Sequence, residues 1–322
     1  MKKFTVTATE ENQRVDKFVM KILSKATKSF IYKMIRKKNI KLNGQKFDGH
    51  EILKTGDEIT IFFSDETFDT FTEETGSPVQ VKTTFGVIYE DEHLLVCDKP
   101  VGLLSQPDGE GDNLVDQVVY YLSGQQSQKM VGFKPGVCNR LDRNTSGIVI
   151  AGKNIKALQA INKAIADHQV DKSYLTIVKG TISGENEIEG YLVKNEAENL
   201  VSISQKPPGD YIKTIYKPIL ANPDYTLLEV RIITGKSHQI RAHLESISHP
   251  VIGDGKYGDP QTNRYFLQKF GLKYQLLHAY QFQFHQLEQP FDYLNEKVFM
   301  APLPKQFKNI LSTLFPEASN EY

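Results

Sequence analysis

The sequence predicts a mixed α+β protein in two parts, a small α/β unit at the N-terminus and a larger α+β unit after it. A chain of 322 residues is long enough for about two domains. The pattern changes near residue 83, where strands of varied length begin to alternate with two clear helices. Strands without regular strand–helix repeats favour an α+β arrangement.

The composition is that of an ordinary globular protein, with 39% hydrophobic and 24% charged residues. No apolar run approaches the roughly 18 residues of a membrane span, and the first residues lack the apolar stretch of a signal peptide. Two cysteines, Cys97 and Cys138, are too few for a disulfide or metal framework. We therefore expect a protein of the reducing cytoplasm that does not bind membranes.

Charge is distributed unevenly along the chain. Residues 1–64 carry 14 Lys and Arg against 7 Asp and Glu, whereas residues 65–322 carry 25 against 32. A basic unit attached to an acidic body is expected of an appended domain that binds anions such as nucleic acid. A lysine-rich solubilising surface explains the same counts, and charge alone does not choose between the two.

The N-terminal unit, residues 1–64, is expected to contain two helices, a hairpin and a strand. Apolar residues recur at helical spacing over 15–23 and again over 28–39. The second helix has one apolar face, and its other face carries the cations Lys28, Lys33, Arg36, Lys37 and Lys38. Asn43 and Gly44, between two short extended runs, indicate a tight hairpin.

Residues 65–82 are expected to be an acidic linker, because residues 65–80 hold five acids, no base, a glycine and a proline. A solvated connector is the favoured interpretation. Residues 83–322 form the larger unit, in which alternation marks strands and a 3.6-residue period marks helices. The expected elements are a hairpin over 87–100, strands over 147–153, 172–180, 225–234 and 280–287, and helices over 157–168 and 238–247.

Residues 139–147, NRLDRNTSG, place an acid between two arginines on a turn that leads into an apolar strand. Asp142, with Arg140 and Arg143 beside it, fits a catalytic carboxylate that a nearby cation keeps ionised. The pattern is also that of a surface turn with a local ion pair, which is the commoner case. Taken alone, the segment favours the surface turn.

Residues 231–244, RIITGKSHQIRAHL, run from the end of a strand into a helix. Lys236 lies just before the N-terminus of that helix. The free N–H groups of the first turn and the Lys236 ammonium could together hold a phosphate. His238 and Arg241 are three residues apart and share a face, whereas His243 lies on another side. This spacing disfavours a metal site, and the remaining histidines add no ligand spacing.

In the strand over 172–180, Lys172 and Tyr174 lie on one face. A tyrosine beside a lysine could stack on a base while the lysine holds its phosphate. A tyrosine that caps the core from an edge strand is the commoner case, so this segment is also weak by itself.

Together these segments resemble, in order, the RluA-type family of pseudouridine synthases, which modify large-subunit ribosomal RNA. Residues 139–147 are similar to the family's H-R-L-D-x-x-T-S-G, and residues 172–174, KSY, to its K-x-Y. Residues 234–243, TGKSHQIRAH, resemble T-G-[RK]-x-H-Q-[IL]-R-x-H. Residues 249–259, HPVIGDGKYGD, resemble the family's H-P-x-x-x-D-x-x-Y-G loop. The likeness covers about residues 83–303 and implies mainly antiparallel sheets with flanking helices and a central cleft.

Residues 14–62 resemble an S4 domain, a module that binds structured RNA, with two helices, a hairpin at Ile40–Gly44 and a T-G-D-x-I segment. The resemblance implies that the cationic helix and Asn43 contact RNA. One position departs from the catalytic pattern, since Asn139 stands where the family usually has histidine. If that histidine buttresses the loop, the amide of Asn139 can replace it. If it contacts RNA, the choice of substrate differs.

The resemblance implies an enzyme that isomerises uridine to pseudouridine in structured RNA, with 23S ribosomal RNA as the expected substrate and transfer RNA as the alternative. Asp142 would act as a nucleophile at C1′ or as a base at C2′, with Arg241 pairing its charge and Tyr174 stacking on the extruded uracil. The implied RNA contacts in the larger unit are Arg140, Arg143, Lys172, Lys236 and His238. No atom is gained, so neither cofactor nor metal is expected, and we expect a monomer.

Two other functions compete with this one. A non-catalytic RNA-binding or ribosome-assembly protein of the same fold would keep the basic unit but lack turnover. A metal-dependent hydrolase would need histidines at ligand spacing. The intact Asp142, Tyr174 and Arg241 favour the enzyme.

Overall fold

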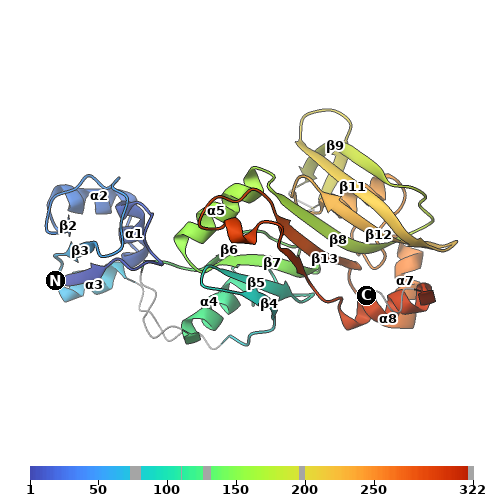
Figure 1. Ribbon diagram of the computed structural model, residues 1–322, viewed down its shortest axis with the longest axis horizontal. Coiled ribbons are helices and arrows are strands. Elements are labelled where there is room, and N and C mark those ends of the chain that lie inside the picture. The colour runs from blue at the N-terminus through green and yellow to red at the C-terminus, as the bar shows by residue number, and fades with distance from the viewer. Residues whose placement is uncertain (73–80, 110, 126–131, 196–199, 318–322) are drawn as a thin grey trace.

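The computed structural model describes residues 1–72, 81–109, 111–125, 132–195 and 200–317. The N-terminal part lies at one end of the molecule, and the larger unit extends from it to the other end (Figure 1). We refer to residues 1–72 as the N-terminal module and to residues 81–317 as the main unit.

The N-terminal module is a three-stranded antiparallel sheet covered by two helices. Its strands pair in the order β1–β3–β2, and α1 and α2 bury their apolar faces against them. The elements are β1 (Lys2–Thr5), α1 (Val15–Ile22), α2 (Lys28–Arg36), β2 (Ile40–Leu42), β3 (Glu58–Ile61) and α3 (Asp65–Phe71). The two expected helices and the turn after β2 are confirmed, although the second run of the hairpin makes only an isolated bridge from Gln45 to Leu42.

Helix α3 occupies residues 65–71 of the segment expected to be an acidic linker, and the sequence did not indicate a helix there. Ser64 caps the helix by accepting the Thr67 N–H at 3.2 Å. Phe68 stacks on Phe4, and Phe71 packs against Phe30 with ring centroids 4.2 Å apart. Acidic composition masked a short helix whose two phenylalanines complete the core of the module. Residues 73–80 of the linker lie outside the described residues.

The main unit is built on an 11-stranded sheet in which most neighbouring strands are antiparallel. Its strands run in the order β10–β9–β11–β12–β8–β13–β7–β5–β4, with β14 beside β13 and β6 beside β7. Their bounds are β4 (Gly86–Glu90), β5 (Leu94–Lys99), β6 (Gly136–Val137), β7 (Ser146–Gly152), β8 (Val170–Lys179), β9 (Asn186–Asn195), β10 (Leu200–Ser204), β11 (Asp210–Ala221), β12 (Tyr225–Ile232), β13 (Leu277–Phe284) and β14 (Val298–Met300). The mixed α+β fold that the sequence predicts is confirmed.

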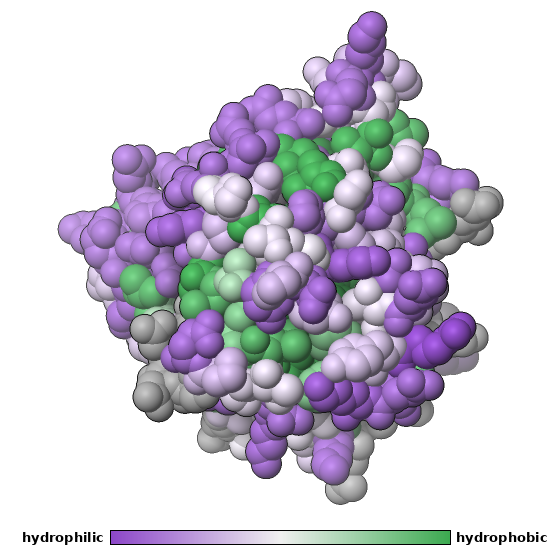
Figure 2. Space-filling view, turned by 90° about the vertical axis from the view of Figure 1, so that its right-hand side faces the viewer, coloured by the Kyte–Doolittle hydropathy of each residue, from purple (hydrophilic) through white to green (hydrophobic). Residues whose placement is uncertain are grey.

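Helices cover both faces of this sheet, because alternate residues of each strand point to opposite sides. Residues of α4 and α6 pack in one hydrophobic cluster, and those of α5, α7 and α8 pack in clusters on the other face. The helices are α4 (Leu114–Gln125), α5 (Ile155–Ala166), α6 (Gln239–Ser246), α7 (Pro260–Phe270) and α8 (Lys305–Leu314), with a 3₁₀ turn, η1, at Asp292–Leu294. Figure 2 looks onto the end of the molecule where α7 and α8 lie and shows hydrophobic side chains interleaved with hydrophilic ones.

The two halves of the sheet meet where β7 lies parallel to β13. Two residue pairs form there, His278 with Ser146 and Ala279 with Gly147. Gly147 has φ +111°, and a Cβ at this position would lie 2.2 Å from the carbonyl oxygen of Ala279. A glycine is therefore required for the two strands to approach this closely.

In the described part of the chain, none of the helices has the length and apolar character needed to cross a bilayer.

Candidate active site

Asp142 lies on the loop between β6 and β7, at the edge of a cleft of about 860 Å³. The Thr145 N–H donates to the Asp142 carbonyl at 3.0 Å, which closes the turn predicted from the sequence. The Asp142 side chain is 24% exposed, so one side of the carboxylate faces the cleft. The carboxylate is therefore accessible to a bound molecule while its loop is fixed.

Arg241, on the buried side of α6, pairs with this carboxylate across 99 residues of sequence. Its Nη1 donates to Asp142 Oδ2 at 2.9 Å, and its side chain is only 6% exposed. The two side chains thus form a charge-assisted hydrogen bond in partly buried surroundings. The structure thus brings together the two residues that the sequence places in one site.

Asp254 holds Arg241 from the opposite side, and sequence reasoning did not assign it a role. Arg241 Nε and Nη2 donate to the two Asp254 oxygens at 2.6 and 2.8 Å. Burial opposes the charge on Asp254, yet the hydrogen bonds and charge of Arg241 outweigh it and lower the pKa of the carboxyl. The available signal was an acid between two glycines within the loop at 249–259.

The order of these contacts fixes the direction of the guanidinium. Asp254 takes Nε and Nη2 in a bidentate pair, which leaves Nη1 directed at Asp142. The buried carboxylate of Asp254 is fully covered, whereas that of Asp142 is open to the cleft. The arrangement leaves a single accessible anion beside a rigid cation.

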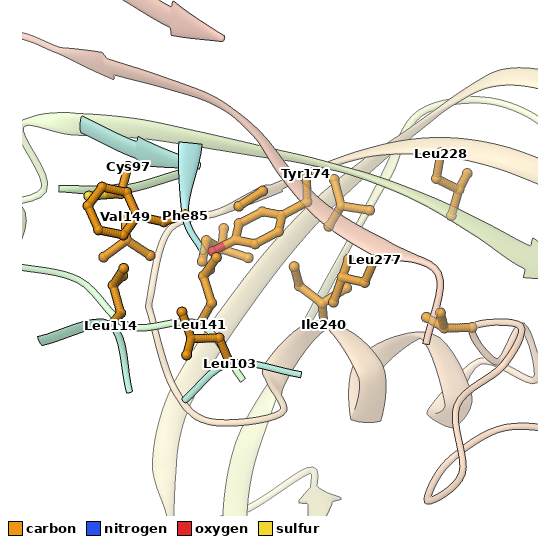
Figure 3. Close-up of a cluster of buried hydrophobic side chains, with 14 of the residues drawn as sticks. Phe85, Cys97, Leu103, Leu114, Leu141, Val149, Tyr174, Leu228, Ile240 and Leu277 are labelled. Atoms are coloured by element: carbon orange, nitrogen blue, oxygen red, sulfur yellow. The ribbon is translucent and has the colours of Figure 1, made fainter. Parts of the chain in front are cut away.

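Tyr174 lies on β8 and lines the same cleft. It packs in the hydrophobic cluster with Leu141, Ile240 and Leu277, and Figure 3 shows its hydroxyl directed toward Leu141, the residue before Asp142. Burial, reinforced by the negative charge of Asp142, raises the pKa of the Tyr174 phenol. The phenol is therefore protonated at neutral pH and offers an apolar ring face rather than a base.

Comparison with known proteins agrees with this geometry. A family model described as RNA pseudouridylate synthase matches residues 93–246. The protein described as uncharacterized RNA pseudouridine synthase MG370 of Mycoplasma genitalium is 34% identical, with 89% of this chain and 90% of that protein covered. Ribosomal large subunit pseudouridine synthase C of Haemophilus ducreyi is 30% identical, with 98% and 96% covered.

The chain belongs to the RluA-type family of RNA pseudouridine synthases. Among solved structures, human RNA Pseudouridylate Synthase Domain Containing 4 superposes with a TM-score of 0.59 at 21% identity, covering 71% of this chain and 92% of that one. At that identity the likeness concerns the fold, and it confirms the pseudouridine synthase fold expected from the sequence.

In this pseudouridine synthase, Lys99 and Ser105 hold the loop at 139–147 in place through hydrogen bonds to its backbone. Lys99 Nζ, fully buried, donates to the carbonyls of Pro100, Leu103 and Arg143. Ser105 Oγ donates to the Leu141 carbonyl at 2.8 Å and accepts the Leu141 N–H at 3.0 Å. Burial lowers the pKa of Lys99 to about 7, against the opposing charges of Asp142 and Asp98. The sequence did not reveal the role of either residue, because both act through hydrogen bonds to backbone atoms.

Asn139, which replaces the family's usual histidine, ties the loop to β7. Its amide Nδ2 donates to the Ile148 carbonyl at 3.1 Å, and its Oδ1 accepts the Ile150 N–H at 2.8 Å. Both halves of the amide are thus used in buttressing the loop, which is the first of the two roles considered for this position.

The expected RNA-contacting residues lie around the cleft. Lys172, Lys236 and His238 line it, as do Arg140 and Arg143. Arg140 and Arg143 are exposed at its edge, where Arg143 Nε donates to the Gly102 carbonyl at 3.2 Å.

The N-terminal end of α6, beside Lys236, differs from the phosphate site that was expected there. The helix begins at Gln239, and the Gln239 side chain accepts the Lys236 N–H at 3.1 Å, while the Lys236 ammonium pairs with Asp210 at 3.1 Å. A phosphate at this position would have to replace that carboxylate. His238 precedes the helix in the left-handed region, and its ring nitrogen lies 3.0 Å from the Tyr257 hydroxyl.

Helix α5 supplies a wall of the cleft that sequence reasoning did not foresee. Asn162 and Ile165 line the cleft from its C-terminal part, and His168 lines it from the turn that follows the helix. The expected helix itself is confirmed, but its periodicity gave no sign that one end of it borders the site.

In the N-terminal module, the cationic face of α2 is exposed as expected. Ile31, Met34 and Ile35 are buried, and none of the five cations pairs with a carboxylate in the described residues. Asn43 is already engaged, since its amide donates to Asp57 at 2.9 Å and its oxygen accepts the Glu58 N–H at 2.8 Å. Its side chain thus shapes the turn. Across the described residues, no group of three or more His, Cys, Asp and Glu could hold a metal ion.

Proposed function

We propose that this pseudouridine synthase isomerises uridine in large-subunit ribosomal RNA, with Asp142 as its catalytic carboxylate. The observation that carries the proposal is the carboxylate of Asp142, open to the cleft and paired through Arg241 with a buried second acid. Several relatives named ribosomal large subunit pseudouridine synthase C or D align with most of the chain, which favours ribosomal RNA over transfer RNA.

The isomerisation breaks the bond between N1 of uracil and C1′ of the ribose, and a new bond joins C5 to C1′ after the base has turned. The hydrogen on C5 leaves as a proton and N1 gains one, so the atoms balance without a cofactor. Asp142 serves as a nucleophile at C1′ or removes a proton from C2′. Both roles use the carboxylate, which Arg241 holds through an ion pair and a hydrogen bond.

Tyr174 provides the surface on which the detached uracil rests. Its ring lies in an apolar cluster beside Leu141 and Ile240, and a base stacked on an aromatic ring is held without hydrogen bonds that would fix its orientation. The base can then turn while it stays in the cleft. Because the phenol remains protonated, the ring carries no charge where the uracil stacks on it.

The target uridine must leave its stacked position to reach Asp142, as in other enzymes that act on a base. Arg140 and Arg143 lie exposed at the edge of the cleft, suited to backbone phosphates or to the gap left in the stack. Lys172, within the cleft, and His238 lie near the position of the target nucleotide.

The N-terminal module is assigned as an S4-like RNA-binding domain. The support is the exposed cationic face of α2 on a helix–helix–strand framework. Such a face adds affinity that depends on salt and little on sequence. We also propose that the enzyme acts as a cytoplasmic monomer, which sedimentation and fractionation would test.

The decisive experiment is tritium release from ribosomal RNA labelled with [5-³H]uridine. The purified protein should release tritium, and Asp142→Asn, which keeps the shape but not the charge, should lower the rate by about 10³-fold or more. Asp224→Asn, an exposed turn residue, serves as the control and should match the unaltered protein. Full activity in Asp142→Asn would exclude this mechanism.

The substrate is tested by the same assay with labelled 23S ribosomal RNA and labelled transfer RNA offered separately. The proposal expects release from ribosomal RNA. Release from transfer RNA alone would move the enzyme to the other substrate class while leaving the role of Asp142 intact.

A further inference from the structure

The N-terminal module contacts the main unit through residues 9–13, the loop that precedes α1. Two side chains of this loop bind Gly132. The Gly132 N–H donates to Glu10 Oε1 at 2.8 Å, and Gln13 Nε2 donates to the Gly132 carbonyl at 3.2 Å. Lys21 in turn donates to Gln13 Oε1 at 2.8 Å. Glu10 and Gln13 are both buried, and their polar atoms are paired, as a specific interface requires.

Gly132 fits this interface because it has no side chain. A Cβ at this position would lie 2.0 Å from the ring of Phe18, in the core of the module, and 2.9 Å from Glu10 Oε1. Any larger residue would push the module away from the main unit. The contact therefore depends on shape complementarity between the two surfaces and not only on long, flexible side chains.

The same loop binds the first turn of α5. The Ile155 N–H, which has no partner within the helix, donates to the Thr9 carbonyl at 3.2 Å. Glu11 pairs with Lys156. Beside them Asn12 Nδ2 donates to Gln159 Oε1 at 2.9 Å, and Gln159 Nε2 donates to the backbone carbonyl of Asn12 at 3.2 Å.

Helix α5 thus contacts the module at one position and lines the cleft at another. Gln159 touches the module, and Asn162, three residues later and on the same side of the helix, lines the cleft. Three residues of helix rise about 4.5 Å. Less than one helical turn therefore separates Gln159, which contacts the module, from Asn162, which lines the cleft. Figure 1 shows α5 in the part of the main unit nearest to the module.

The part of α5 that follows presents polar groups to solvent. Asn162 and His168 are exposed, and their side chains form no hydrogen bond with any described residue. An amide and an imidazole can each donate to a phosphate and read a base edge. Lys163, next to Asn162, is instead neutralised by Asp167 at 2.8 Å.

We infer that the N-terminal module works from one fixed position, docked on Gly132 and α5, and that RNA held by the module crosses the exposed side of α5 into the cleft, where Asn162 and His168 contact nucleotides next to the target. The inference rests on the proposed function, because it names the path of the RNA substrate. A docked module presents its cations at a set distance from Asp142, so RNA bound at one site enters the other at a high effective concentration.

Fixing the module in place tests whether the docked position is the working one. In Asn12→Cys/Gln159→Cys, a short bismaleimide should link the two parts in high yield without RNA, because their amides touch in the docked position. The linked protein should release tritium from a 23S ribosomal RNA fragment within twofold of Asn12→Cys and Gln159→Cys treated alike. Failure to link, or a linked protein that is inactive while the single variants are active, would overturn the inference.

Displacing the module gives the converse test. Gly132→Ala should lower kcat/KM on the ribosomal RNA fragment by roughly tenfold. Its rate on a stem-loop too short to reach the module should equal that of the unaltered protein, which also shows that the main unit has folded. An equal rate on both RNAs would mean that docking has no part in delivery.

The path over α5 is tested by Asn162→Ala/His168→Ala, with Lys163→Ala as the matched control on the same helix. The double variant should raise KM for the fragment several-fold and leave kcat close to its original value, whereas the control should change neither. Unchanged KM in the double variant would remove α5 from the path. A protein that never releases tritium refutes the proposed function instead, and the yield of the cross-link still measures docking.

Discussion

The loop at 139–147 and helix α2 both carry clusters of charge, but the structure treats them in opposite ways. In the loop, Asp142 has one partner in Arg241, and the backbone around it is held by Lys99, Ser105 and Asn139. On α2, five cations project into solvent without a carboxylate partner among the described residues. One region holds a single charge in position through several contacts, and the other exposes many charges with few contacts to hold them.

The difference agrees with the role proposed for each region. Chemistry at one atom of a ribose needs a carboxylate placed within a fraction of an ångström, which packed and hydrogen-bonded surroundings provide. Affinity for a phosphate backbone needs total charge, and exposed cations supply it at little cost in desolvation. Substitutions of the carboxylates that bind Arg241 should therefore be severe, whereas single substitutions on α2 should be mild.

The sharpest test of this contrast is Asp254→Asn. Removing one partner of a buried pair leaves Arg241 undercompensated, so we expect a loss of about 3–5 kcal/mol in the free energy of unfolding and a fall in kcat of at least tenfold. Because the pKa of Asp254 is lowered in the folded protein, its contribution is complete at neutral pH and is lost as the pH falls. Denaturation curves from pH 7 to 3 should show a weaker acid dependence in the variant. An unchanged kcat would show that Arg241 does not need its second carboxylate.

Lys99 gives the next largest expected effect, with the same sign as that of Asp254 but over a more alkaline pH interval. Its pKa of about 7 lies below the ordinary lysine value, so between pH 7 and 10 the unfolded chain binds more protons than the folded one. Stability should therefore rise with pH over this interval, by up to about 3 kcal/mol at pH 9.5 relative to Lys99→Met. Thermal midpoints of the two proteins at several pH values measure it. Parallel pH profiles would mean that Lys99 keeps an ordinary pKa.

On α2 we expect effects that accumulate. Lys33→Gln/Arg36→Gln/Lys37→Gln should weaken binding of ribosomal RNA about tenfold and reduce the slope of log K against log salt by about 2–3, while kcat at saturating RNA stays the same. Filter binding across a salt series measures this. Lys82→Gln/Lys134→Gln/Lys206→Gln, with three exposed cations removed from the main unit, is the matched control. A lower kcat in the α2 variant would contradict the difference in role that is proposed between α2 and the loop at 139–147.

The smallest effect is expected at Asn139, where the support of the loop is shared. Asn139→Ala removes two hydrogen bonds and should cost about 1–2 kcal/mol in the free energy of unfolding, with tritium release reduced only a few-fold. Asn139→His, the residue usual in the family, should recover part of the loss. A fall in activity as deep as that of Asp142→Asn would show that Asn139 contacts the substrate.

The elements that sequence reasoning recovered are those with a strong local pattern. The helices at α1, α2, α5 and α6 and the strands β5, β7, β8 and β12 have clear periodicity, and the structure confirms them. Helix α3 was hidden because its only apolar residues, Phe68 and Phe71, stand among acids. Helices α7 and α8 and the strands from β9 to β11 were not predicted individually, although α8 and β11 contain several apolar residues, and their burial depends on distant partners.

The site was predictable as far as its motifs extend. Asp142, Tyr174 and Arg241 were recognised from linear segments, and the structure places all three at one cleft. The roles of Asp254, Lys99 and Asn162 depend on contacts between segments far apart in the chain, which no local spacing encodes. The same holds for the interface at Gly132, where the signal is the absence of a side chain.

The close pairing of Gly147 with Ala279 has a consequence for when the enzyme becomes active. Asp142 belongs to the half of the sheet that contains β7, whereas Tyr174 and Arg241 belong to the half reached through β13. During synthesis, residues 1–270 can already contain all three side chains, but the strand that aligns them has not yet been made. A nascent chain of this length therefore lacks the strand that joins the two halves and holds Asp142 beside Tyr174 and Arg241.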